Sequence, residues 1–184
     1  QMPEVYFASA YDDKFVIEGN SSLGDELAKR DFDVVISPVG GGGLISGIIL
    51  GLSRNSKQTQ VFGAEPLLGN DASLSLKAGR IIANETEPMT IADGARTISL
   101  GNLNWEIIKG DVAGIFEVPD ETIAEAVRLY FGLVNLKCEP TGALSLGAVL
   151  LNKEQFSGHK ICVVVSGGNV DLSVYTTLLS EPPA

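Results

Sequence analysis

Basic residues, histidine and cysteine are scarce in this 184-residue chain. Lys and Arg number 13 against 23 Asp and Glu, so the formal net charge is −10 with the single His159 neutral. That balance argues against a surface for nucleic acid or for anionic membranes. No apolar run approaches the roughly 20 residues of a membrane helix, and the start, QMPEVYFASAYDD, lacks the basic and apolar regions of a signal peptide. We therefore expect a cytoplasmic protein that binds neither nucleic acid nor membrane.

The two cysteines, Cys138 and Cys162, each lie in an apolar stretch. This placement favours buried free thiols in a reducing compartment over a disulfide framework. The sequence also lacks internal repeats, low-complexity tracts and any clear linker. With 45% hydrophobic residues and 21 glycines, it is typical of one globular domain or at most two small ones.

Short β-branched apolar runs alternate with segments whose apolar residues recur at three- and four-residue spacing. Asp120 is expected to cap its helix, and Gly79 to end another in the left-handed conformation. The alternation predicts an α/β fold, an open twisted mostly parallel sheet with helices on both faces. The predicted strands are 34–37, 61–64, 114–118 and 160–166, the predicted helices are 22–30, 44–53, 71–79, 120–135 and 141–152, and the least regular segment, 80–105, is a candidate active-site loop.

The most informative motif is VVISPVGGGGLISG, residues 34–47, in which four consecutive glycines separate an apolar strand from an apolar helix. Such a run costs conformational entropy, so it indicates that the backbone comes close to another group. Bare N–H groups at a helix N-terminus suit a phosphate. The dinucleotide fingerprint fails because Ile45 or Ser46 stands in its last glycine place, and the P-loop fails because Ile48 stands where it needs lysine. A tight turn without a ligand is the alternative.

A second glycine turn lies in KICVVVSGGNVD, residues 160–171, directly after another apolar strand. Ligands of doubly wound sheets bind at the carboxyl ends of the strands. A lone Ser-Gly-Gly is more often a plain turn, but in combination with the tetraglycine loop it predicts that both turns face one ligand.

Five segments, in this order and at these intervals, carry a family resemblance: SPVGGGGLISG, GAEPLLGNDAS, TIADGA, KCEPTGALSLGA and VVVSGGNVD. The chain resembles the pyridoxal-phosphate enzymes of the serine/threonine dehydratase and serine racemase family, from about Tyr11 to Asp171. The resemblance implies a tryptophan-synthase-β-like fold. It also implies a lyase that dehydrates and deaminates L-serine, L-threonine or a similar β-hydroxy amino acid to a 2-keto acid and ammonia. A racemase of the same family is the near alternative.

The resemblance implies site residues as well. The cofactor phosphate would bind the backbone N–H groups of the glycine loop, and the hydroxyl of Ser166 would bond the pyridine nitrogen. Gly94 would contact the ring or the substrate through its backbone, with Asp93 as a loop-fixing hydrogen bonder. Glu139 would lie close to the pyridine edge, although a plain helix start explains Glu139 and Pro140 equally well. The implied cofactor-binding residues are Gly40, Gly41, Gly42, Gly43, Leu44, Gly94, Glu139 and Ser166.

A divalent cation site is also implied. Some family members bind Mg²⁺, Mn²⁺ or Ca²⁺ through a Glu, a backbone carbonyl and an Asp, which correspond here to Glu65, the carbonyl of Gly69 and Asp71. Hard cations prefer oxygen ligands and keep waters in their remaining positions. Two surface carboxylates near a helix N-terminus are the alternative.

No lysine of the chain has the setting of the family's catalytic lysine, which stands in a Ser-x-Lys-x-Arg-Gly-Ala-like motif nearer the N-terminus. The resemblance therefore implies that residues 1–184 are an incomplete large, cofactor-binding domain without the lysine-bearing segment and the small domain. We expect that missing part as a partner, in the same polypeptide or as a separate chain, and a homodimer of the full enzyme. A non-catalytic phosphate-binding module is the alternative, whereas the failed glycine spacings disfavour a nucleotide-binding Rossmann protein.

Overall fold

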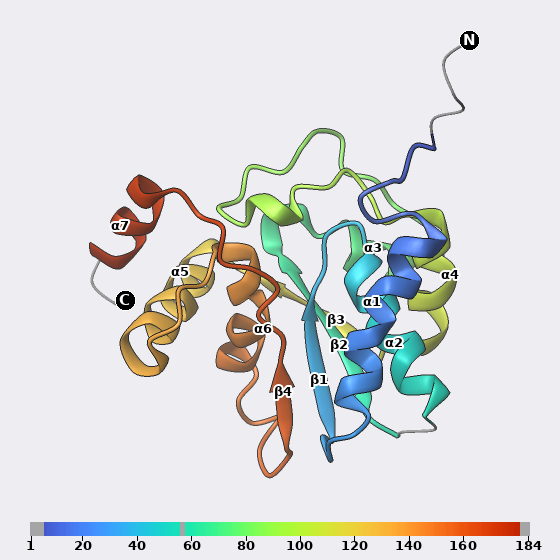
Figure 1. The fold of residues 1–184 in the computed structure, drawn as a ribbon. Coiled ribbons are helices and arrows are strands. Elements are labelled where there is room, and N and C mark those ends of the chain that lie inside the picture. Colours follow the sequence, from blue (N-terminus) through green and yellow to red (C-terminus); the bar gives the residue numbers. More distant parts are fainter. Residues whose placement is uncertain (1–5, 56–57, 181–184) are drawn as a thin grey trace.

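The computed structural model describes residues 6–55 and 58–180. Its four strands form one sheet of order β3-β2-β1-β4, and every pair of neighbours is parallel (Figure 1). The strands are β1 (Val34–Pro38), β2 (Gln60–Pro66), β3 (Gly114–Val118) and β4 (Ile161–Val163). The helices are α1 (Lys14–Leu27), α2 (Gly43–Arg54), α3 (Asp71–Ala78), α4 (Asn102–Asp111), α5 (Asp120–Leu129), α6 (Pro140–Leu151) and α7 (Leu172–Ser180), with 3-10 turns η1 (Leu67–Gly69) and η2 (Asp93–Ala95) and a π-helical turn η3 (Tyr130–Val134).

Strand β1 is buried along its whole length, and its side chains alternate between two hydrophobic clusters. Val34 and Ile36 belong to the cluster that contains α5, α6 and α7, whereas Val35 belongs to the cluster that contains α2 and α4. Figure 1 shows these two groups of helices on opposite sides of the sheet. A continuous apolar run is what a parallel strand needs when helices cover both faces. The predicted α/β fold with a mostly parallel sheet is thus confirmed.

Three element ends differ from the prediction. Helix α1 begins at Lys14 rather than residue 22, because the Asp13 carboxylate accepts hydrogen bonds from the N–H groups of Phe15 and Val16. Strand β4 ends at Val163, three residues before the predicted end. The helix predicted over 120–135 is α-helical only to Leu129 and continues as the π-helical turn η3.

Of the two predicted caps, one is confirmed and one is wrong. Gly79 ends α3 with a left-handed φ of 68°. Asp120 does not cap α5, whose N-cap is Pro119; its carboxylate instead accepts hydrogen bonds from the Thr90 hydroxyl and the Ile91 N–H. The carboxylate ties the segment before η2 to α5.

Two helices, α4 and α7, were not predicted. Helix α4 starts inside the segment expected to be irregular. Its first N–H groups, those of Asn102 and Leu103, donate to the Asp12 carboxylate, which lies some 90 positions earlier in the chain. No local pattern shows such a cap. Within the described residues, no helix has the length and apolarity needed to cross a membrane.

Candidate active site

The eight residues implied to bind the cofactor all line one cavity, of about 280 Å³. The cavity lies past the carboxyl ends of β1 and β4, which are neighbours in the sheet. The glycine loop follows β1, and Ser166 follows β4. Residues of both glycine turns therefore line one cavity, while the predicted shared ligand stays a prediction. The lining also includes residues that sequence reasoning had not selected: Ala10, Tyr11, Pro38, Thr97 and Thr141.

The glycines of the loop are required by close contacts with the rest of the protein. A Cβ atom on Gly41 would lie 2.1 Å from the Tyr11 ring, and one on Gly43 would lie 2.9 Å from the Tyr11 carbonyl oxygen. Gly42 has a left-handed φ of 94°, which favours glycine. The expectation that the backbone must approach another group closely thus holds, and Tyr11 is one such group.

The N–H groups of this loop are free to bind a ligand. Gly41, Gly42 and Gly43 are buried, yet among the described residues the N–H groups of residues 40–44 donate to no protein acceptor. A buried N–H group without a partner costs free energy comparable to a lost hydrogen bond. These groups also stand at the N-terminus of α2, where the helix dipole favours negative charge. The arrangement suits a phosphate.

Gly94 lines the cavity, and its N–H group is already bonded within the protein. Its N–H donates to the Thr141 hydroxyl oxygen at 2.9 Å and to the Asp93 carboxylate at 2.9 Å. The Asp93 bond joins neighbouring residues, so a loop-fixing role for Asp93 stays a prediction. The Gly94 carbonyl oxygen lies 3.1 Å from the position of a Cβ atom on Gly40, so the two loops touch here.

Glu139 connects the start of α6 to the turn that carries Ser166. Its carboxylate accepts a hydrogen bond from the Asn169 N–H at 2.8 Å, and its own N–H donates to the Gly167 carbonyl at 3.2 Å. Glu139 occupies the N-cap position of α6 without a side-chain capping bond. The plain helix start is therefore an incomplete account of this side chain, which shapes the second glycine turn.

The residues implied to bind a metal lie at the end of β2 and the start of α3. Glu65 is 1% exposed and Asp71 is 2% exposed, so the alternative of two surface carboxylates is wrong. The Glu65 carboxylate accepts hydrogen bonds from the N–H groups of Ala72 and Ser73 at 3.1 and 2.7 Å. It thereby caps α3 from a neighbouring strand. Gly69, the third predicted ligand, ends the 3-10 turn η1 between them.

The pKa values of both buried carboxyl groups are raised. Burial, reinforced by the nearby charges of Asp71 and Glu117, raises the pKa of Glu65 to about 8. Burial also raises the pKa of Asp71 to about 7, although Asn84 donates a hydrogen bond to Oδ1. In the described part of the chain, Asp71 Oδ2 has no hydrogen-bond partner, and no group of three or more His, Cys, Asp or Glu side chains could hold a metal ion.

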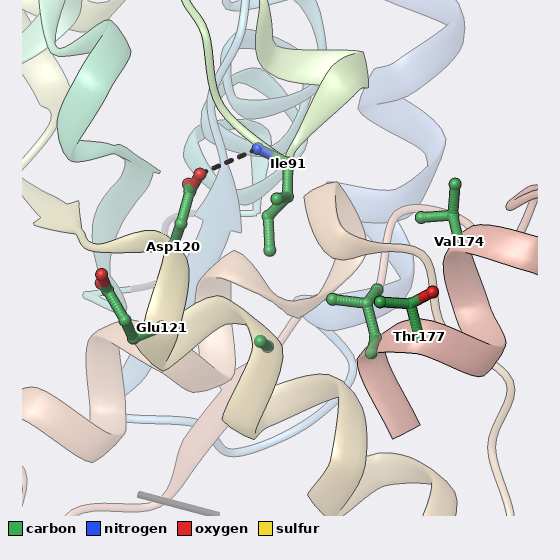
Figure 2. Close-up of a pocket in the computed structure, with 7 residues that line it drawn as sticks. Ile91, Asp120, Glu121, Val174 and Thr177 are labelled. Atoms are coloured by element: carbon green, nitrogen blue, oxygen red, sulfur yellow. Dashed lines mark hydrogen bonds between the residues drawn. The ribbon is translucent and has the colours of Figure 1, made fainter. Parts of the chain in front are cut away.

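A second cavity, of about 390 Å³, lies between the start of α5 and helix α7 (Figure 2). Figure 2 shows Asp120 and Glu121 on one side, Val174 and Thr177 on the other, and Ile91 between them. The Asp120 carboxylate is already bonded to Thr90 and Ile91. Though larger, this cavity is mainly apolar and includes neither glycine turn, so it is a weaker candidate for the active site.

Comparison with known proteins shows the family to which the chain belongs. Residues 1–167 match the family described as "Pyridoxal-phosphate dependent enzyme". The chain belongs to this family. It is 40% identical to a β-hydroxyaspartate dehydratase of Paracoccus denitrificans over 90% of this chain and 53% of that protein. It is 38% identical to a serine racemase of Schizosaccharomyces pombe over 93% of this chain and 53% of that protein.

The fold agrees with this assignment. The crystal structure of a T.th. threonine deaminase superposes with a TM-score of 0.84 at 40% identity, over 88% of this chain and 54% of that one. The chain thus spans about half the length of the relatives it matches.

Proposed function

We propose that this chain is the cofactor-binding part of a pyridoxal-phosphate-dependent lyase. The enzyme would dehydrate and deaminate a β-hydroxy amino acid of the L-serine or L-threonine type to a 2-keto acid and ammonia. The observation that carries the proposal is a single cavity lined both by residues 40–44, whose N–H groups donate to no acceptor among the described residues, and by Ser166. Family membership and relatives named dehydratase and deaminase support it.

The residues present fit the cofactor. The glycine loop would hold its phosphate through the N–H groups of Gly40 to Leu44 at the N-terminus of α2. Ser166 would donate a hydrogen bond to the pyridine nitrogen, and a neutral hydroxyl does not keep that nitrogen protonated as a carboxylate would. Glu139 would hold the Ser166 turn in place through Asn169. When bound, pyridoxal phosphate supplies the electron sink that makes the substrate Cα acidic and lets the β-hydroxyl leave.

We infer that a lysine-bearing part completes the enzyme. Residues 1–184 would form most of its large domain, and β4 would receive the missing part at its open edge. Within the described sheet, β4 pairs only with β1, and its residues Ile161 to Val163 are half-buried. An unpaired parallel edge invites a further strand. The enzyme would act as a homodimer. The free cysteines Cys138 and Cys162 suit a reducing compartment such as the cytoplasm.

A divalent cation would bind Glu65, the carbonyl of Gly69 and Asp71. The buried, unpartnered Oδ2 of Asp71 fits this role, and oxygen donors are what Mg²⁺, Mn²⁺ and Ca²⁺ prefer. Millimolar Mg²⁺ or Ca²⁺ should raise the unfolding temperature of the native protein and leave that of Asp71→Asn unchanged. Asp31→Asn, whose side chain is 90% exposed, is the matched control. An equal rise in Asp71→Asn would contradict the site.

The test of function uses the natural polypeptide that contains this chain. We expect a visible absorption band that borohydride abolishes, and the release of ammonia and a 2-keto acid from L-serine, L-threonine or 3-hydroxyaspartate. Chiral analysis of the remaining amino acid tests the racemase alternative, which relatives named serine racemase support. A colourless protein without any of these products would favour a non-catalytic phosphate-binding module.

A further inference from the structure

A fully buried asparagine that does not line the cavity is hydrogen-bonded to the glycine loop. Asn104 lies in the first turn of α4 and has no exposed surface. Its side-chain amide Nδ2 donates to the Gly41 carbonyl oxygen at 2.8 Å and to the Tyr11 carbonyl oxygen at 3.0 Å. The Gly101 N–H donates to the same Gly41 carbonyl at 3.0 Å. Two donors, one from α4 and one from its N-cap residue Gly101, thus fix one peptide of the loop.

The hydrogen bonds to the Gly41 carbonyl determine where the Gly42 N–H group points. In a trans peptide the C=O and the following N–H lie on opposite sides, and the described residues contain no cis peptide bond. Because the Gly41 carbonyl is held against α4, the Gly42 N–H is directed away from α4. Gly41 and Gly42 line the cavity and Asn104 does not. The peptide between them therefore presents its N–H group on the cavity side.

The same segment that covers the loop also anchors α4. The Asp12 carboxylate accepts hydrogen bonds from the N–H groups of Asn102 and Leu103 at 3.0 and 2.9 Å. A Cβ atom on Gly101 would lie 2.5 Å from Asp12, so the contact is tight. Tyr11, next in sequence, packs its ring on Gly41. Tyr11 and Asn104 thus both contact the loop, and the Asn104 amide also bonds to the Tyr11 carbonyl oxygen.

We propose that Asn104 is a positioning residue for phosphate recognition: its amide holds the Gly41 peptide so that the Gly42 N–H is preset for the cofactor phosphate. The inference rests on the proposed function, since it assumes that the loop binds that phosphate. Both acceptors of the Asn104 amide are backbone carbonyl oxygens of this chain, so the amide can hold the Gly41 peptide in place before the phosphate binds. The side chain at this position must be a donor, because an acceptor atom in place of Nδ2 would face the carbonyl oxygens of Gly41 and Tyr11.

The test compares two probes, pyridoxal 5′-phosphate and pyridoxal, which lacks the phosphate. Both dissociation constants are measured on the natural polypeptide and on Asn104→Leu, which keeps the volume but removes the donor. Asn102→Leu is the matched control, because the Asn102 side chain is exposed two residues earlier on the same helix. For Asn104→Leu we expect affinity for the phosphorylated probe to fall by roughly tenfold or more, as for a lost hydrogen bond to a charged group, and affinity for pyridoxal to change less than about twofold. Asn102→Leu should change neither.

Three outcomes would overturn the inference or its basis. Unchanged affinity of Asn104→Leu for the phosphorylated probe would exclude the positioning role. Equal weakening for both probes, with a lower unfolding temperature of the cofactor-free protein, would show a purely structural role. A native protein that binds the two probes equally well would instead contradict the proposed function.

Hydrogen exchange on the unmutated protein gives a second test that does not depend on a variant folding. The Gly42 N–H should exchange more slowly with pyridoxal 5′-phosphate than with pyridoxal, because only the phosphate accepts its hydrogen bond. Equal exchange with both probes, despite tight binding of the phosphorylated one, would overturn the inference.

Discussion

At the scale of single residues, the glycine loop shows why a ligand-binding motif cannot be understood from the ligand alone. Gly41 has room for no side chain, since a Cβ atom would lie 2.1 Å from the Tyr11 ring. Gly41→Ala should therefore lower the free energy of unfolding by about 1–3 kcal/mol and weaken cofactor binding as the ring moves into the cavity. Gly110→Ala, on α4 with no atom within 4 Å of the new Cβ, is the control. Urea unfolding measures the stability of both variants. Equal stabilities of Gly41→Ala and Gly110→Ala would contradict the tight contact between Gly41 and the Tyr11 ring.

Glu117 on β3 makes a second prediction at this scale, one of pH dependence. Its carboxylate accepts hydrogen bonds from Lys77 at 2.8 Å, Ser73 at 2.7 Å and Asn70 at 3.1 Å. These contacts, with Lys77 foremost, lower the pKa of Glu117 from 4.5 to about 2. The folded state then binds fewer protons than the unfolded state between these two values. The stabilisation is therefore complete above pH 4.5 and is lost as the pH falls toward 2.

The variant Glu117→Gln should accordingly be less stable than the native protein near neutral pH, with a gap that narrows as the pH falls below 4.5. Urea unfolding over a series of pH values measures this. Glu106→Gln, which removes a largely exposed ion pair with Lys109, should change stability little at any pH. A gap that stayed constant down to low pH would mean that Glu117 does not act through its charge.

At the scale of elements, the sequence predicted what local patterns control. Strand β3 has the predicted bounds, and α2, α3 and α6 begin within one residue of their predicted starts. Helix α4 was not predicted, because the residue that caps it, Asp12, lies far away in the sequence. The candidate site divides in the same way. Its two glycine turns carry local motifs, whereas Tyr11 and Asn104 reach the loop only through tertiary contacts.

Only part of helix α1 was predicted. Its small residues allow close packing against α2 and do not form the apolar stripe by which a helix is predicted. A Cβ atom on Gly51 of α2 would lie 2.2 Å from the Ser21 carbonyl oxygen, and one on Gly24 of α1 would lie 2.4 Å from the Ile48 carbonyl oxygen. Gly51→Ala should force the helices apart and lower the free energy of unfolding by about 2 kcal/mol or more. Gly19→Ala, exposed on α1, should raise it by up to about 1 kcal/mol. Thermal unfolding measures both variants. A change in stability of the same sign for Gly51→Ala and Gly19→Ala would contradict this packing.

At the scale of the whole molecule, the exposed surface supports the proposal that a further part of the enzyme covers some of it. Large apolar side chains are widely exposed, with Phe7 at 88%, Leu172 at 80% and Leu133 at 77%. Strand β4 adds an unpaired backbone edge in the described sheet. Exposed apolar surface and open edges promote association. The acidic charge of −10 limits non-specific contact and favours a specific partner.

The thiols test this at the strand edge itself. Cys162 lies in β4 and is half-buried, whereas Cys138 is fully buried, which raises its pKa to about 12. In the 184-residue chain alone, iodoacetamide should therefore modify Cys162 well before Cys138, because the thiolate is the reactive form and needs access. When the lysine-bearing part pairs with β4, Cys162 should react more slowly while Cys138 stays slow in both samples. Mass spectrometry of timed reactions measures the two rates. Because Cys138 reports any general loosening of the fold, an unchanged Cys162 rate beside a slow Cys138 would mean that the missing part does not cover this edge.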